Sequence, residues 1–232
     1  MIPLRDATPP RRTPVVTSAL LLACTVVFLG EVVVLAQGGN AALERLVNDR
    51  GLVPADLVAA LHGQDTGTQP FLDLFTSMFL HAGWLHLLGN MLFLWIFGNN
   101  VEDRMGRIWF PLLYLAGGVA AAAAHVVSDP TSTVPVIGAS GAISAVLGAY
   151  LVLYPRARIQ SLVFLGFFYQ LIAVPSVIVL GFWFVLQLID GIASLGAVAT
   201  VDGGVAFWAH VGGFVAGAVI ALPFRLRQPR VG

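Results

Sequence analysis

The sequence predicts an all-α membrane protein, a bundle of six transmembrane helices with both termini in the cytoplasm. Of its 232 residues, 58% are hydrophobic and only 10% are charged, whereas a soluble domain carries about 25% charged residues. The mean hydropathy is +0.87. The chain therefore has too little polar surface for a soluble domain, and we expect it to lie in a lipid bilayer. Its net charge is zero and lysine is absent, so nucleic acid is not an expected partner.

Six apolar segments are candidate spans, each near the roughly 20 residues that cross a bilayer. In order, they are residues 14–37, 82–98, 108–127, 138–154, 173–192 and 205–224. Thr13 is the expected N-cap of the first, with Pro14 as its first helical residue. Residues 159–172 are also apolar, but we expect them to lie along the inner interface or to lead into the fifth span. The expected organisation is a cytoplasmic segment, a membrane domain and a cytoplasmic tail, over residues 1–13, 14–224 and 225–232.

The distribution of arginine predicts the orientation. Only Arg45 and Arg50 lie in the long loop after the first span. The others lie in segments that all face one side if there are six spans: Arg5, Arg11, Arg12, Arg104, Arg107, Arg156, Arg158, Arg225, Arg227 and Arg230. Because cytoplasmic loops are enriched in Lys and Arg, we expect these segments in the cytoplasm. A seventh crossing by residues 159–172 would place the C-terminal arginines outside.

Five polar residues are predicted to lie at one depth, near the outer face. The stretch FLHAGWLHLLGNM places His81, His86 and Asn90 at the outer end of the second span. Ser140 stands at the outer end of the fourth span, and His210 lies one to two turns into the sixth. Polar groups are costly in a bilayer and usually face a cavity or one another. We therefore expect these side chains to gather.

Small residues offer a second interpretation of the same helices. Ser140, Ser144 and Gly148 form a small-xxx-small ridge, and Gly213 and Gly217 form a G-x-x-x-G pattern. Both patterns are typical of helix packing in membranes. The two interpretations are compatible, because close packing of the fourth and sixth spans would bring the serine within hydrogen-bond reach of the histidine in the sixth.

These residue types favour nucleophilic catalysis. A serine hydroxyl attacks well only when a base takes its proton, and His210 is the histidine placed to serve Ser140. The side chains of His86 and Asn90 could donate hydrogen bonds to a developing oxyanion. The free backbone N–H groups at the start of the fourth span, including that of Ser140, could do the same. Acyl transfer is the expected chemistry.

A third member of the catalytic group is less clear. Glu31 and Asp190 lie towards the outer ends of the first and fifth spans, away from the helices that carry the other groups, so we expect a Ser–His dyad. Zinc bound by the three histidines named above is the rival hypothesis. Neither an H-E-x-x-H helix nor a cysteine cluster supports it, since Cys24 is the only cysteine. We expect no metal and no other cofactor.

Four stretches together resemble the rhomboid family of intramembrane serine proteases: FLHAGWLHLLGNMLFLWIFGNNVEDRMG, YLAGGVAAA, GASGAISAVLGAY and AHVGGFVAG. The resemblance runs from about Gly51 to Leu222. It implies that Ser140 is the nucleophile and His210 the base. It further implies an oxyanion hole and a set of supporting residues: His86, Asn90 and the Ser140 amide for the hole, with His81, Gly138, Gly141, Gly213 and Gly217 in support. Glu102 and Arg104 match an inner-loop pair that stabilises that loop.

The resemblance also implies a substrate class and a location. Rhomboid proteases cut single-span membrane proteins near the outer face, and we expect this chain in the cell's inner (plasma) membrane with such substrates as partners. Two features depart from the family. Ser144 stands where some members carry an aromatic that stacks on the base, so His210 must be oriented by another group. The Trp-Arg pair that some members have in the first loop is not evident between Gln37 and Pro70.

Three other functions are weighed against the protease. A catalytically silent rhomboid-like chaperone or interaction protein would share the fold but should lack Ser140 or His210, and both are present. A small transporter would need polar groups along a full path, yet the inner halves of the second, fourth and sixth spans are apolar. A passive scaffold would not need a histidine opposite a serine.

Overall fold

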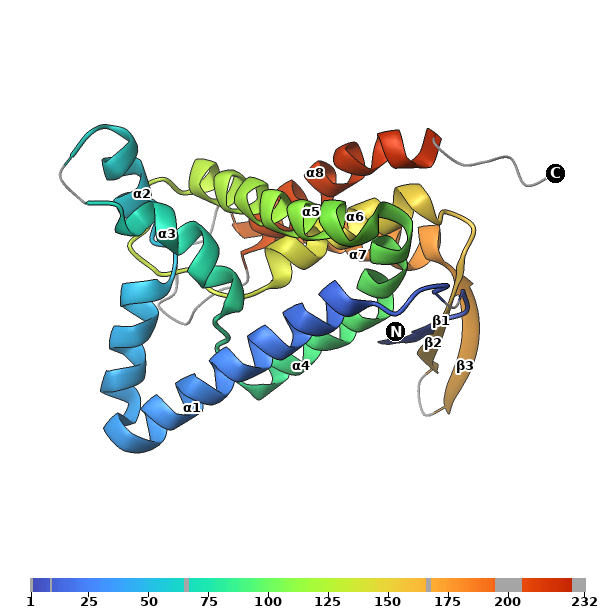
Figure 1. The fold of residues 1–232 in the computed structure, drawn as a ribbon, viewed down its shortest axis with the longest axis horizontal. Coiled ribbons are helices and arrows are strands. Elements are labelled where there is room, and N and C mark those ends of the chain that lie inside the picture. Colours follow the sequence, from blue (N-terminus) through green and yellow to red (C-terminus); the bar gives the residue numbers. More distant parts are fainter. Residues whose placement is uncertain (1, 9, 65–66, 166–167, 195–205, 227–232) are drawn as a thin grey trace.

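The computed structural model describes residues 2–8, 10–64, 67–165, 168–194 and 206–226, and the chain is mostly helical (Figure 1). The helices are α1 (Val15–Arg50), α2 (Pro54–Leu61), α3 (Gln69–Thr76), α4 (Trp84–Phe93), α5 (Asn99–Ser128), α6 (Ser140–Leu153), α7 (Ser176–Ser194) and α8 (Phe207–Leu226). A short 3-10 helix, η1 (Ser77–Phe79), precedes α4, and a π-helical turn, η2 (Leu94–Gly98), joins α4 to α5.

Four helical segments in the described part of the chain are long and apolar enough to cross a membrane: Val15–Arg50, Trp84–Ser128, Ser176–Ala193 and Phe207–Arg225. The second combines α4, η2 and α5, with a break at Gly106, where φ is +85°. Helix α6 is apolar but shorter. Part of each predicted segment is therefore helical, but the second and third lie in one continuous helical stretch and four helical segments have the length of a span. Val205 of the predicted sixth span, and Arg227 and Arg230 of the predicted tail, lie outside the described residues.

The start of α1 differs from the prediction. Thr13 is not the N-cap: Pro14 holds that position without a side-chain cap, and the helix begins at Val15. The Glu102 carboxylate instead accepts hydrogen bonds from the backbone N–H groups of Val16 (3.0 Å) and Thr17 (2.7 Å). A residue distant in sequence therefore satisfies N–H groups that the first helical turn leaves free.

The end of α1 also differs from the prediction. The helix passes Gln37, bends sharply at Gly39 and continues to Arg50, as Figure 1 shows. Gly39 has φ +67°, a conformation that glycine adopts without the steric cost of a Cβ. After the bend, the last part of α1 runs towards α2 and α3 (Figure 1), and Gln69 and Thr76 of α3 donate hydrogen bonds to the carbonyls of Asp49 and Arg50.

The expectation of an entirely helical chain is wrong at one end of the molecule. There β1 (Ile2–Asp6), β2 (Arg158–Leu165) and β3 (Phe168–Pro175) form an antiparallel sheet with β2 in the centre. Residues 158–175 are rich in β-branched and aromatic side chains, which favour strands, and the ladder satisfies their backbone groups. The apolar run 159–172 is therefore not a membrane-spanning helix. Helix α7, which corresponds to the fifth predicted span, begins at Ser176 and not at the predicted residue 173.

A buried polar cluster attaches β1 to the bundle. The Asp6 carboxylate accepts hydrogen bonds from the Asn100 amide and the Tyr150 hydroxyl. Tyr154 donates to the backbone carbonyl of Asn100 at 3.1 Å. Because buried charges need such partners, this cluster fixes the N-terminal strand against α5 and α6.

Helix α6 forms the centre of the bundle, and every residue from 142 to 150 is buried. Glycines let α8 approach it closely. A Cβ at Gly213 would overlap the carbonyl oxygen of Gly141, and one at Gly217 would overlap that of Ala145. From the other side, a Cβ at Gly148 would overlap the carbonyl oxygen of Phe214. The contact between α6 and α8 is therefore backbone against backbone, as small-xxx-small patterns permit.

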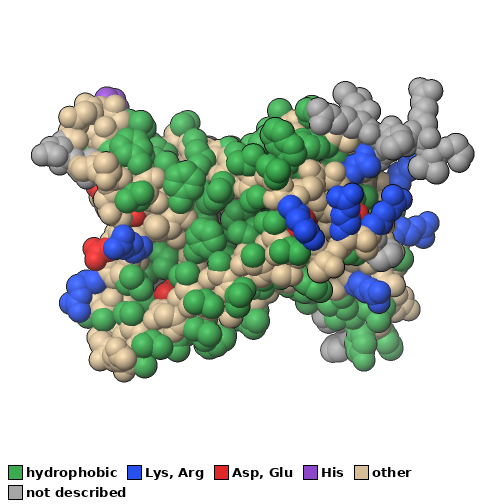
Figure 2. Space-filling view, viewed as in Figure 1, with side chains coloured by type: hydrophobic (Ala, Val, Ile, Leu, Met, Phe, Trp, Pro, Cys, Tyr) green, Lys and Arg blue, Asp and Glu red, His purple; other side chains and the backbone are tan. Residues whose placement is uncertain are grey.

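Arginine side chains lie at both ends of the molecule, and apolar side chains cover the face between them (Figure 2). The larger group lies at the end that carries the sheet, where β1 contains Arg5 and β2 contains Arg158. The smaller group lies among acidic side chains at the opposite end, where the last turns of α1 carry Arg45 and Arg50. Arginines predicted for the two sides of a membrane therefore lie at opposite ends of the bundle.

Candidate active site

Ser140 is the first residue of α6, and two backbone contacts fix the segment that leads to it. Val136 pairs with Leu52: the Leu52 N–H donates to the Val136 carbonyl at 3.0 Å, and the Val136 N–H donates back at 2.8 Å. The Gly138 N–H donates to the carbonyl of Ser77 at 2.8 Å. Gly138 has φ +130°, which favours glycine at this position. The start of α6 is thus held from both η1 and the loop after α1.

Ser140 and His210 lie within hydrogen-bond distance. The Ser140 Oγ is 2.8 Å from the His210 Nε2, although the two residues are 70 positions apart. His210 lies in the first turn of α8 and is only 9% exposed. The close packing of α6 and α8 places these two side chains together.

The sequence analysis missed the residue on the other side of the histidine. The Gln187 Oε1, on α7, is 2.5 Å from the His210 Nδ1. Trp183 lies one helical turn earlier on α7. The centroid of its ring is 5.9 Å from that of the imidazole, and the two ring planes are inclined by 40°. The Ser144 hydroxyl donates to the Ser140 carbonyl at 2.7 Å. A single glutamine in an apolar helix gives no sequence signal for this contact beyond its polarity.

Hydrogen bonds define the proton positions on His210. A neutral imidazole has one N–H donor and one acceptor nitrogen. With the Gln187 oxygen facing Nδ1, that nitrogen carries the proton and donates it to the amide oxygen. The Nε2 is then the acceptor, and the Ser140 hydroxyl donates to it. This is the tautomer that a base needs in order to take the serine proton.

His86 lies against the segment just before the serine. Its Nδ1 accepts the backbone N–H of Ala82 at 3.3 Å, so in the neutral ring Nε2 carries the proton. A Cβ at Gly138 would stand 2.8 Å from that Nε2. The close approach explains why glycine is needed there, and it puts a ring N–H donor beside the backbone that leads to Ser140.

Asn90 lies one turn after His86 on the same face of α4. It is 8% exposed, and its Nδ2 is buried without a hydrogen-bond partner among the described residues. A buried amide donor without a partner costs free energy in the folded protein. Such a group is suited to an acceptor that arrives with a substrate.

His81, predicted as a supporting residue, and Glu31, which was not expected to take part in catalysis, both support the loop before α4. The Glu31 carboxylate accepts the backbone N–H of His81 at 3.2 and 3.3 Å. The His81 Nδ1 bonds the carbonyl of Phe79 at 3.1 Å, and its ring lies 5.2 Å from that of His86. Glu31 is therefore tied to the loop beside His86, and Asp190 is exposed on α7.

The rival hypothesis from the sequence was a zinc ion bound by His81, His86 and His210. In the described ranges, no group of three or more His, Cys, Asp or Glu side chains is arranged to hold a metal ion. One ring nitrogen of His81, one of His86 and both of His210 are hydrogen-bonded to other groups of the protein.

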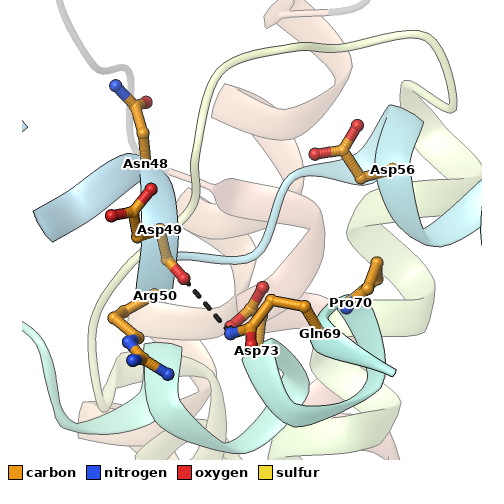
Figure 3. Close-up of a pocket in the computed structure, with 7 residues that line it drawn as sticks. All are labelled: Asn48, Asp49, Arg50, Asp56, Gln69, Pro70 and Asp73. Carbon is orange, nitrogen blue, oxygen red and sulfur yellow. Dashed lines mark hydrogen bonds between the residues drawn. The ribbon is translucent and has the colours of Figure 1, made fainter. Parts of the chain in front are cut away.

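A separate polar pocket lies at the end of the molecule that carries α2 and α3 (Figure 3). Its volume is about 520 Å³, and its lining residues are Asn48, Asp49, Arg50, Asp56, Gln69, Pro70 and Asp73. Gln69 crosses it to donate to the Asp49 carbonyl at 3.2 Å. None of the lining residues belongs to the Ser140 site, so this pocket is distinct from it.

The fold and the site together define a helical integral membrane protein with a serine and a histidine paired inside its bundle. The family model described as Rhomboid domain matches residues 68–227, which contain all the site residues named above except Glu31 and Leu52. The chain belongs to the rhomboid family.

Named relatives come from bacteria and from eukaryotes. The chain is 37% identical over 150 residues to "Rhomboid protease GluP" of Bacillus subtilis, covering 65% of this chain and 26% of that protein. It is 38% identical over 78 residues to "Putative rhomboid protease YdcA" of Bacillus subtilis, covering 34% and 39%. It is 36% identical over 90 residues to the mitochondrial "Presenilin-associated rhomboid-like protein A" of Danio rerio, covering 38% and 24%. The matches thus span roughly a quarter to two fifths of these relatives.

Proposed function

We propose that this protein is an intramembrane serine endopeptidase that cleaves single-span membrane proteins with a Ser140–His210 dyad. The observation that carries the proposal is the 2.8 Å contact between the serine hydroxyl and the imidazole Nε2. The names of the two bacterial relatives describe proteases, which agrees with this chemistry. A packing role alone gives no reason for a histidine to be buried opposite a serine.

The proposed reaction begins when the Ser140 oxygen attacks the carbonyl carbon of a peptide bond while its proton passes to the His210 Nε2. The carbonyl oxygen becomes an oxyanion in the tetrahedral intermediate. Collapse of the intermediate breaks the C–N bond, and His210 gives its proton to the leaving amine. Water then attacks the acyl-enzyme in the same way, with His210 again as base, and releases the second product.

Three donors are proposed to bind the oxyanion: the His86 Nε2–H, the Asn90 side-chain amide and the backbone N–H of Ser140. The last lies at the N-terminus of α6, where free N–H groups and the helix dipole favour negative charge. Donors of this kind stabilise charge that develops only in the transition state. The partnerless Asn90 Nδ2 supports this assignment.

The proposed topology has six spans in residues 14–224, with both termini cytoplasmic, in the plasma membrane. The opposite locations of Arg5 and Arg158 on one hand and Arg45 and Arg50 on the other support it. The catalytic pair would then lie near the outer face. A substrate helix hides its carbonyls in hydrogen bonds, so it must unwind locally before a serine can reach one.

The proposal is tested by labelling the detergent-purified protein with a fluorophosphonate and by cleavage of a model single-span substrate. We expect label on Ser140 in the wild type, none in Ser140→Ala, and substrate cleavage only by the wild type. A folded wild-type protein that neither labels nor cleaves would instead favour a silent rhomboid-like chaperone or interaction protein.

The topology is tested separately by cysteine accessibility in a Cys24→Ala background. A membrane-impermeant thiol reagent added from the outer side should modify a cysteine introduced at Asp56 and spare one at Arg156. Modification at position 156 in sealed cells would contradict the six-span arrangement.

A further inference from the structure

The orientation of His210 is the question that the Ser140 site leaves open. Ser144 stands at the position where some rhomboids carry an aromatic residue that stacks on the base. Its hydroxyl donates a hydrogen bond to the Ser140 carbonyl. Besides Ser140, the side chains that contact the His210 ring through a hydrogen bond or ring packing include two from α7. Gln187 bonds its Nδ1 and Trp183 packs near its ring, and these residues are four apart, so they share one face of the helix.

Gln187 is a polar residue in an apolar helix, where its side chain lowers stability unless it has a hydrogen-bond partner. Helix α7 is apolar, and many of its large side chains are exposed to the surroundings, including Phe182, Val185 and Ile189. A polar side chain in a membrane helix costs free energy unless it is partnered, and such residues commonly serve function. The partner of this glutamine is the proposed base itself.

We infer that Gln187 is the positioning residue of the dyad: its amide oxygen holds the proton of His210 on Nδ1 and leaves Nε2 free to accept the proton of Ser140. The inference rests on the proposed function and adds a third residue to it. A neutral amide does for orientation what a carboxylate does in a Ser-His-Asp triad, where the wrong tautomer costs several orders of magnitude in rate. It does so without placing a charge in the bundle, where desolvation of a carboxylate is costly.

Trp183 completes the support from α7. The centroid of its ring lies 5.9 Å from that of His210 and 6.0 Å from that of Phe214, both on α8. The indole restricts the imidazole from one side, while the Gln187 oxygen fixes its rotation. The base therefore belongs to α8 but takes its orientation from α7.

The test compares two replacements that separate hydrogen bonding from packing. Gln187→Met keeps the length and much of the volume but removes the acceptor. Gln187→Glu keeps an oxygen acceptor, whether ionised or protonated, but fits less well into an apolar helix. Leu186→Met, on an exposed neighbour, is the matched control. Each variant is measured for fluorophosphonate labelling rate, kcat and KM with a model substrate, and thermal stability.

We expect the two replacements to rank in opposite orders for activity and for stability. Gln187→Met should lower kcat and the labelling rate by roughly 10- to 100-fold, with little change in KM, because a poorly oriented base costs about that much. Gln187→Glu should retain activity within about fivefold of the wild type, since its acceptor keeps the geometry that Met loses. Gln187→Met should nevertheless be at least as stable as Gln187→Glu, and the control should match the wild type throughout.

A Gln187→Met protein that labels at the wild-type rate would overturn the inference, and so would a Gln187→Glu protein less active than Gln187→Met. A wild-type protein that does not label at Ser140 would instead remove the proposed function itself. The two failures are therefore distinguishable in one experiment.

Discussion

Replacement of Glu102 by alanine should destabilise the protein strongly without altering the chemistry at Ser140. Glu102 is 3% exposed, and its carboxylate accepts three hydrogen bonds from α1: the backbone N–H groups of Val16 and Thr17 and the Thr17 hydroxyl at 2.8 Å. A buried donor left unsatisfied costs about 1–3 kcal/mol. Thr17 is fully buried, whereas Val16 is half-buried and can reach water. We therefore expect a loss of about 2–4 kcal/mol in the free energy of unfolding.

The matched control for this change is Asp103→Ala. Asp103 accepts the backbone N–H groups of Arg11 and Arg12 at 3.2 and 3.0 Å, but these bonds are exposed. Water can replace them, so the loss should be below about 1 kcal/mol. The assay is reversible unfolding in mixed micelles followed by circular dichroism, with fluorophosphonate labelling of the folded protein at low temperature. Equal stabilities for the two variants, or slow labelling of folded Glu102→Ala, would contradict this account of α1 capping.

Three further predictions concern the site and the helix contact beneath it. Ser140→Ala and His210→Ala should each give background cleavage of a model substrate, and the double variant should lose little more, because the two groups act as a unit; additive losses would contradict the dyad. Asn90→Ala should lower kcat on the order of 10²–10³-fold with Ser140 still labelled, since it removes one oxyanion donor; unchanged kcat would remove Asn90 from the oxyanion hole. Gly217→Ala should lower the free energy of unfolding by about 1–3 kcal/mol, because its Cβ meets the rigid backbone of Ala145. Gly181→Ala, with nothing within 4 Å of its Cβ, should be neutral or stabilising, and equal losses in thermal melts of the two variants would refute the backbone contact.

The spatial grouping of the site could be predicted from sequence because it depends on a few strong rules. The bilayer fixes where spans begin and end, so Ser140 and His210 could be assigned one depth from their positions alone. The glycines at 213 and 217 then indicated which helices pack closely. Both inferences use local patterns, and the structure places the two side chains 2.8 Å apart.

Contacts between distant segments could not be predicted in this way. Thr13 has the right chemistry and position for an N-cap, but the Glu102 carboxylate, 85 residues after Thr17, satisfies the first turn of α1 instead. Gln187 is one polar residue in an apolar helix, and only the rotation of α7 about its axis decides whether it faces His210. The run 159–172 has the hydrophobicity of a buried helix, and the pairing of Ile2 with Leu162 that makes it a strand is invisible locally.

The attachment of the N-terminal strand determines the order in which the molecule can be assembled. Asp6 bonds Tyr150, which is 144 residues later in the chain, and β1 pairs with β2, which is made later still. During synthesis the first turn of α1 therefore lacks its carboxylate partner until Glu102 has been made, and the first strand stays unpaired until β2 follows. Closure of this sheet must consequently wait until the whole chain from α1 to β2 has been synthesised.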